Sequence, residues 1–198
     1  MRSSHRRQLR RIHRRFGRDA GGAISFEFAV TFPLLMLLLI SSFAFFDAFR
    51  TNALMAKIGY AINDIVSRFK EASPAAITEM ALLQRKMTPF NVSAQQIRIT
   101  NICMGPNGFR VFWSASEAEA GTTPLPILTD ATIPLDIMPV LAEQESVMLT
   151  EIRGTWAPLI DGFGLTDREF SSELVIRPRF VRMMPHTTLA PGTPICPG

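Results

Sequence analysis

The chain has 198 residues, of which 47% are hydrophobic, and its formal net charge is +4. Residues 1–22 carry eight basic side chains and one acidic one, a net charge of +7, whereas the other 176 residues carry 13 basic and 16 acidic side chains, a net charge of −3. A nucleic-acid-binding domain spreads its basic residues over a folded face, so the confinement of positive charge to one short terminal segment argues against nucleic acid as a partner.

An apolar run, residues 23–46, follows this basic segment directly. Polar side chains interrupt it at five positions: Ser25, Glu27, Thr31, Ser41 and Ser42. A bilayer core about 30 Å thick needs about 20 helical residues, so the run predicts a transmembrane helix. A removable secretory signal has a shorter apolar region of about 7–15 residues and a small-residue cleavage site, which the sequence lacks. Because Lys and Arg beside a span stay on the cytoplasmic side, we expect a cytoplasmic N-terminus and an extracytoplasmic C-terminal part.

Helical periodicity continues beyond the predicted span, through residues 47–70. The apolar stripe of this extension consists of six residues: Leu54, Ile58, Ala61, Ile62, Ile65 and Phe69. Polar side chains such as Lys57, Asp64 and Arg68 lie on the opposite side. This amphipathic pattern predicts that the extension packs its stripe against a folded domain formed by residues 71–198.

The domain itself is expected to be of the α+β class. Ser73 and Pro74 are typical of an N-cap and a first helical position, so we predict a second helix over 74–87. Alternating apolar and β-branched residues predict four antiparallel strands, at 95–102, 109–115, 146–156 and 171–181. The sequence thus predicts a long N-terminal helix packed on a small antiparallel sheet.

Turns and irregular segments are expected to separate these strands. Residues 104–108 predict a hairpin turn and residues 161–164 a second turn. Residues 117–142 predict a loop that carries one short helix near 138–143. The Pro-rich tail from Pro185 onward is expected to be irregular.

The two cysteines, Cys103 and Cys196, fall in the predicted extracytoplasmic part, where thiols can be oxidised. They form no C-x-x-C motif and have no neighbouring His, unlike a metal or redox site. We therefore predict a disulfide bond that closes a loop of about 90 residues and stabilises the domain by about 4–5 kcal/mol in the chain-entropy model. Two free buried thiols are the alternative.

The sequence offers few residues for catalysis. Of three His, His5 and His13 lie in the basic segment and His186 in the Pro-rich tail, which leaves no His-based triad or metal cluster. The closely spaced acidic pairs, at 117 and 119 and at 143 and 145, are typical of solvated surface. We therefore expect no enzymatic activity, no cofactor and no metal.

Glu27 is an acid inside the apolar run. An ionised carboxylate costs about 2.5–3.5 kcal/mol at mid-membrane on insertion scales, and less near an interface. If the chain were cut after Gly22, Ala23 would gain a charged α-amine about one helical turn from Glu27. The two charges could pair within one subunit, or between neighbouring subunits, which would set their axial register. Alternatively, Glu27 only complements the N-terminal end of the helix dipole.

This arrangement, a basic leader, Gly22, Glu27 as the fifth residue beyond it and then an apolar helix, resembles the class III signal of type IV prepilins. The wider segment GGAISFEFAVTFPLLMLLL, with Glu27, Phe28 and Ala29, and with Pro33 before a Leu-rich run, is similar to TadE-like minor pseudopilins of the Tad (Flp) pilus system. The resemblance covers residues 17–49 and continues more weakly through later segments, at 112–114, 151–158 and 175–179.

The resemblance implies a pilin-like fold and a role in pilus assembly at the inner membrane. A prepilin peptidase would cut after Gly22 on the cytoplasmic side and leave Ala23 as the new terminus; a cut after Gly21 is the alternative. Glu27, Phe28 and Pro33 would then serve assembly and register. The implied partners are other pilins or pseudopilins and the pilus assembly platform. The alternative function is an uncleaved single-pass anchor that displays an extracytoplasmic binding domain.

Overall fold

The structure, a computed structural model, describes residues 21–159, 166–188 and 196, and for residues 21–23 it describes the helical backbone only. The chain divides into two compact units, with the boundary between Phe45 and Phe46. Several predicted segments lie outside the described residues: most of the basic leader (1–20), the turn at 161–164, and much of the Pro-rich tail (189–195 and 197–198).

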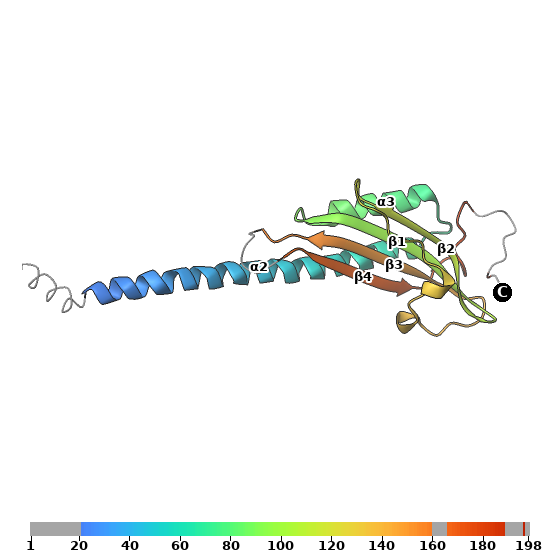
Figure 1. Ribbon diagram of the computed structural model, residues 1–198. Coiled ribbons are helices and arrows are strands. Elements are labelled where there is room, and N and C mark those ends of the chain that lie inside the picture. Colours follow the sequence, from blue (N-terminus) through green and yellow to red (C-terminus); the bar gives the residue numbers. More distant parts are fainter. Residues whose placement is uncertain (1–20, 160–165, 189–195, 197–198) are drawn as a thin grey trace, which may run out of the picture. The chain divides into compact units, whose positions relative to one another are not determined.

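The first element is helix α2, Gly21–Ser67, which contains 47 residues and runs through the boundary between the units (Figure 1). It ends three residues earlier than the predicted position 70. Its last turn tightens there, because the backbone N–H groups of Arg68 and Phe69 donate to carbonyls three residues back. The carbonyl of Ser67 accepts a bond of 2.8 Å from the backbone N–H of Arg179, so the following chain cannot continue the helix.

Helix α3, Pro74–Met87, confirms the predicted second helix and its start. The Oγ atom of Ser73 accepts a hydrogen bond of 3.2 Å from the backbone N–H of Ala76, and Pro74 occupies the first turn, where its missing N–H costs nothing. At the other end, Thr88 bonds back to the carbonyl of Gln84 through both its N–H and its hydroxyl, before Pro89 prevents further helix.

Four antiparallel strands form one sheet in the order β2-β1-β3-β4, which confirms the predicted α+β layout. The strands are β1, Val92–Gly105; β2, Gly108–Ala118; β3, Ser146–Trp156; and β4, Arg168–Ile176. The turn between β1 and β2 leaves Gly108 at a φ of 118°, a conformation that favours glycine. The prediction for the last strand was wrong at its end: β4 stops at Ile176, because Pro178 has no N–H to donate.

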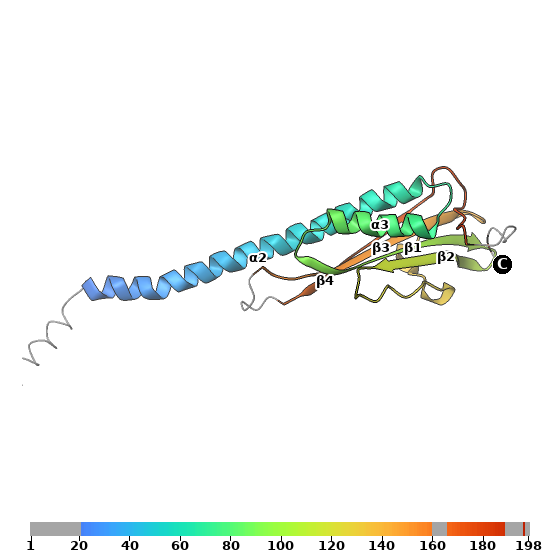
Figure 2. The same cartoon turned by 90° about the horizontal axis from the view of Figure 1, so that it is seen from above.

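One face of the sheet is covered by helices. Figures 1 and 2 show α3 and the part of α2 beyond Phe46 on this face, and buried side chains of both helices share one apolar core with the sheet. The residues of this core that come from the helices are Met55, Ile58, Ile62 and Val66 of α2 and Ile77, Met80 and Ala81 of α3. Ile97, Ile99, Met148 and Ile152 meet them from the sheet.

The predicted apolar stripe of α2 was only partly correct. Its buried members include Ile58 and Ile62, but the others are Thr51, Met55, Gly59, Asn63, Val66 and Ser67. A Cβ atom at Gly59 would lie 3.0 Å from both Leu174 Cδ1 and Ser172 Oγ, so the missing side chain lets the helix approach the sheet closely. Asn63 can be buried at this position because its Oδ1 atom accepts a hydrogen bond from Thr150. Hydrophobicity alone does not identify such positions.

The opposite face is covered by the segment between β2 and β3. Its residues Leu128, Ile133 and Leu141 form a second apolar core with Ile102, Val147 and Leu149 of the sheet. Beneath it, Arg98 and Glu151, which are direct neighbours on β1 and β3, form a buried ion pair, and Arg98 also donates to the carbonyl of Pro126. A buried arginine is thereby satisfied by a carboxylate and a carbonyl.

The short helix predicted near 138–143 does not form. Two single-turn 3-10 helices occur earlier instead, η1 at Asp130–Thr132 and η2 at Leu135–Ile137. Pro139 disfavours helical dihedral angles at the preceding residue, Met138, which is extended with a ψ of 129°. Met138 and Leu141 still pack on the sheet. Apolar residues that are spaced as in a helix therefore hold an irregular segment against the sheet here.

The described start of the Pro-rich tail is fastened to the domain. Ala72 and His186 form an isolated parallel bridge, in which Ala72 donates to the carbonyl of Pro185 and accepts from the N–H of Thr187. The predicted disulfide between Cys103 and Cys196 is present, with a Cα–Cα distance of 6.1 Å and 93 residues of sequence separation. The tail is therefore held by backbone hydrogen bonds as well as by the disulfide.

Candidate functional site

The apolar part of α2 carries a long run of exposed hydrophobic side chains. Its large apolar side chains from Ile24 to Leu39 are each at least 39% exposed, and they point to all sides of the helix. Within the described part of the chain, one helix is long and apolar enough to cross a membrane; its most apolar stretch has a mean hydropathy of 2.2, with none of it buried. A helix that is apolar all round requires lipid or other apolar helices around it.

Glu27 is the only ionisable residue between Ile24 and Phe46, and it is exposed. The residues three and four positions away, which share its side of the helix, are Ala23, Ile24, Val30 and Thr31, so none of them can neutralise it. Among the residues that the structure describes, no hydrogen bond or ion pair reaches its carboxylate. The described residues therefore supply no cation beside Glu27.

The other predicted assembly residues lie on the same stretch of helix. The rings of Phe28 and Phe32 stack with their centroids 5.3 Å apart, as residues four apart on a helix can. Pro33 lies inside α2, where its ring leaves the carbonyl of Ala29 without its usual helical donor. The predicted processing residues Gly22 and Ala23 lie in the first turn of α2, about 6 Å of helix rise before Glu27.

Asp47, the first charged residue after the apolar run, connects α2 to the domain. Its Oδ2 atom accepts two hydrogen bonds, one of 2.7 Å from Asn91 Nδ2 and one of 3.0 Å from Trp156 Nε1. Asn91 directly precedes β1, and Trp156, which is fully buried, ends β3. Sequence analysis did not single out Asp47. The available signal was its position at the end of the apolar run.

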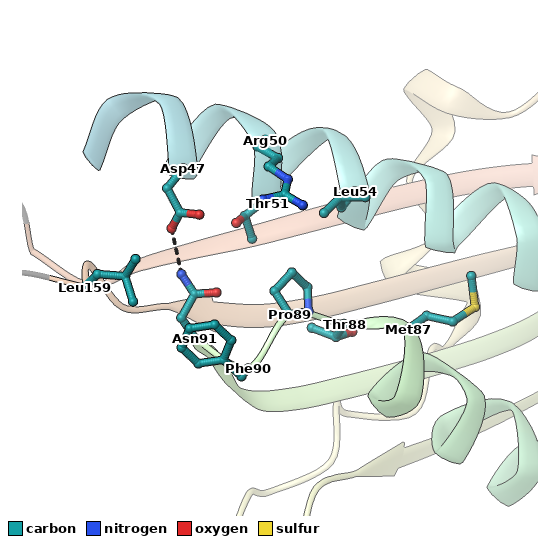
Figure 3. A pocket seen from close by; sticks show the side chains of 10 residues that line it. All are labelled: Asp47, Arg50, Thr51, Leu54, Met87, Thr88, Pro89, Phe90, Asn91 and Leu159. Carbon is teal, nitrogen blue, oxygen red and sulfur yellow. Dashed lines mark hydrogen bonds between the residues drawn. The ribbon is translucent and has the colours of Figure 1, made fainter. Parts of the chain in front are cut away.

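A cavity of about 310 Å³ lies beside Asp47 (Figure 3). Arg50, Thr51 and Leu54 of α2 line it together with Asp47, and they face residues 87–91, which connect α3 to β1. Leu159, from the segment after β3, completes the lining. The cavity thus combines charged groups on the helix with apolar side chains on the surrounding loops.

Replacing Asp47 with Ala is expected to reduce the free energy of unfolding by about 1–3 kcal/mol, because the buried indole N–H of Trp156 then loses its acceptor. Asp47→Asn, which keeps an acceptor oxygen but loses the charge, should cost less, and Ala at the exposed Asp136 should have little effect. Guanidinium unfolding of the full chain in detergent, followed by Trp fluorescence, measures all three variants. An unchanged midpoint for Asp47→Ala would contradict this role.

Further polar contacts fasten α2 near its C-terminal end. Asp64 pairs with Arg179, at 2.6 Å, and with Arg68, at 2.8 Å, while Asn63 accepts the bond from Thr150. Asp47 and Ser67 are 20 residues apart, about 30 Å along a helix. The outer part of α2 is therefore bound to the domain by directional contacts at both ends and by the apolar core between them.

The described residues show little that resembles a reaction centre. No group of three His, Cys, Asp or Glu side chains within the described ranges could hold a metal ion. His186 lies with its ring centroid 5.1 Å from that of Trp113, its Nδ1 atom is 2.7 Å from Thr188 Oγ1, and burial lowers its pKa. These contacts are those of a structural histidine that helps to hold the tail.

Comparisons of the chain with protein-family models, with curated proteins and with solved structures find no match. Any function must therefore be inferred from the residues of the chain itself. Two features stand out: the uncovered apolar helix with its single carboxylate, and the directional contacts between α2 and the domain.

Proposed function

We propose that this protein is a TadE-like minor pseudopilin, a non-enzymatic component in the assembly of a Tad (Flp) pilus. In this proposal it is inserted in the inner membrane with a cytoplasmic N-terminus, and a prepilin peptidase removes its leader after Gly22. The observation that carries the proposal is Glu27, the only ionisable group in an uncovered apolar helix, placed five residues after Gly22 and a leader with a charge of +7.

The charge distribution supports the proposed orientation. The basic residues before Gly22 favour retention of the N-terminus in the cytoplasm. The domain beyond Phe46 would then lie in the periplasm, an oxidising compartment in which the disulfide between Cys103 and Cys196 can form and persist. The proposed topology is therefore consistent with the disulfide bond.

The uncovered helix supports association with similar helices. Within lipid, packing against other helices and pairing of Glu27 with a cation both favour association. Removal of the leader would supply that cation, because Ala23 would then carry an α-amine, either on the same subunit or on a neighbour. Pairing between subunits would place each helix at a defined height relative to the next.

The contacts between α2 and the domain support a role in display or assembly. Asp47, Asn63 and Asp64 hold the domain on the part of α2 that directly follows the apolar segment. A subunit joined to others through its helix would therefore present its domain close to the membrane surface, where other pilins or the assembly platform could contact it.

Intact mass tests the proposed processing. The full chain should lose residues 1–22 in cells with an active prepilin peptidase and keep them in cells without one. Gly21→Ala should be processed normally, whereas Gly22→Val should keep the leader, since the cut is proposed to follow Gly22. If the chain stays full-length in the presence of the peptidase, processing is disproved and an uncleaved single-pass anchor becomes the better explanation.

A further inference from the structure

We infer that the base of the domain, defined as Phe46, Phe49, Phe90 and Leu159, lies in the interfacial layer of the membrane and contacts phospholipid. This inference rests on the membrane insertion assumed in the proposed function. It concerns a different part of the chain from Glu27, because all four residues belong to the unit that begins at Phe46.

The exposure of these side chains is the first argument. Phe90 is 89% exposed, Phe49 73%, Phe46 66% and Leu159 64%. Phe90 and Leu159 lie on connecting segments, after α3 and after β3, where a domain surrounded by water normally presents polar residues. Although they are far apart in sequence, both line the cavity beside Asp47 (Figure 3). Four exposed apolar side chains near one end of the domain indicate an apolar or interfacial environment.

The distance from the predicted span is the second argument. The apolar run ends at Phe46, and the cavity-lining residues Asp47, Arg50 and Thr51 follow one to five residues later, about 2–8 Å along the helix. The interfacial layer on each side of the hydrocarbon core is about 5–8 Å thick, because a core of about 30 Å lies within a bilayer of about 40–45 Å. Phe90 and Leu159 share the cavity with these residues and therefore lie at interfacial depth.

The chemistry of the cavity is the third argument. Arg50 is exposed and lines the cavity beside apolar Leu54, Phe90 and Leu159. A guanidinium group at headgroup depth, next to apolar side chains, matches a phospholipid, which presents a phosphate above its acyl chains. Phe46 and Phe49 are further exposed apolar side chains directly after the predicted span, which favours lipid over a protein partner.

Fluorescence quenching in vesicles tests the inference. The full-length Phe90→Trp variant is reconstituted at a low protein-to-lipid ratio into vesicles of phosphatidylethanolamine and phosphatidylglycerol, with and without lipids brominated in the upper part of the acyl chain. The wild-type chain gives the background from Trp113 and Trp156. We expect the added Trp at position 90 to be quenched at least twofold more strongly than a Trp at a matched control position.

Val140 is that control position, because it is 93% exposed and lies at the opposite end of the sheet. Its carbonyl accepts a hydrogen bond from Arg177, next to Ile176 at one end of β4, whereas Arg168 at the other end pairs with Trp156. Eight residues of strand separate these two ends, about 26 Å. The Trp in Val140→Trp should therefore remain unquenched.

Carbonate extraction of the same vesicles separates the two proposals. Equal quenching at positions 90 and 140 in a chain that resists extraction would overturn the lipid contact and leave membrane insertion intact. A chain released by carbonate would overturn membrane insertion and the lipid contact together. A blue-shifted but unquenched Trp at position 90 would indicate a protein surface, such as a second copy of the chain, and would also overturn the inference.

Discussion

The Glu27→Val variant is expected to insert into the membrane and lose its leader normally, yet to support no pilus assembly above background. Removal of the carboxylate favours insertion, because an ionised acid costs up to about 2.5–3.5 kcal/mol in hydrocarbon. The same change removes the only charge in the uncovered part of α2 and with it the proposed partner of the α-amine on Ala23. Fibres sheared from cells and quantified by immunoblot measure assembly, and intact mass measures processing.

Two matched variants test whether loss of the Glu27 charge causes the expected loss of assembly. Glu27→Gln keeps the size of the side chain and one acceptor oxygen but removes the charge, so it should fail as Glu27→Val does if charge pairing is required. If Glu27 only complements the helix dipole, a contribution of about 0.3–1 kcal/mol, then Glu27→Gln should still assemble. Ser25→Val changes a polar, exposed residue two positions away and should assemble normally. Normal pili in Glu27→Val would rule out the proposed role.

Removal of the disulfide, by Cys103→Ala together with Cys196→Ser, is expected to lower the free energy of unfolding of the domain by about 4–5 kcal/mol. The bond closes a loop with 93 residues of sequence separation, so it strongly restricts the unfolded chain. Domains are stable by only about 5–15 kcal/mol, so this loss brings the domain close to unfolding. Guanidinium unfolding of the full chain in detergent gives the value, because both Trp113 and Trp156 report on this domain.

Reduction of the wild-type chain is the control for the small cavity that Cys103→Ala introduces at a fully buried position. A reducing agent should move the wild-type midpoint to that of the double variant and should leave the variant unchanged. A double variant within about 1 kcal/mol of the oxidised wild type would show that the loop constraint contributes little, as strain or residual structure in the unfolded chain can cause.

Local signals predicted much of the fold correctly. Ser73 and Pro74 mark the start of α3, because a cap depends on the hydroxyl and the backbone of a few consecutive residues. All four strands were found, since alternation over five to eight residues is visible in the sequence. The predictions failed at the end of β4 and in the segment between β2 and β3, where the apolar pattern continues past Pro178 and Pro139 although each proline disfavours continued regular structure.

The contact between α2 and the sheet shows which parts of the candidate site cannot be predicted from the sequence. Asp47 has no distinguishing neighbours in sequence, and its partners Asn91 and Trp156 are 44 and 109 residues away. In the sequence, Gly59 and Asn63 interrupt an apolar stripe. In the structure, both lie in the contact between α2 and strands β3 and β4. Neither role can be assigned before the register of the strands is known.

Consecutive residues suffice to establish an apolar helix long enough for a membrane, a strongly basic segment before it, and a single acid, Glu27, within it. Each of these features belongs to one continuous segment. The hydrophobicity and the net charge of a segment depend little on the rest of the chain. The tertiary structure decided which face of α2 is buried, that Asp47 joins the helix to Asn91 and Trp156, and that Phe90 and Leu159 line the same cavity beside it. Those features arise from close packing and hydrogen bonds between residues far apart in sequence, which the folded backbone alone brings together.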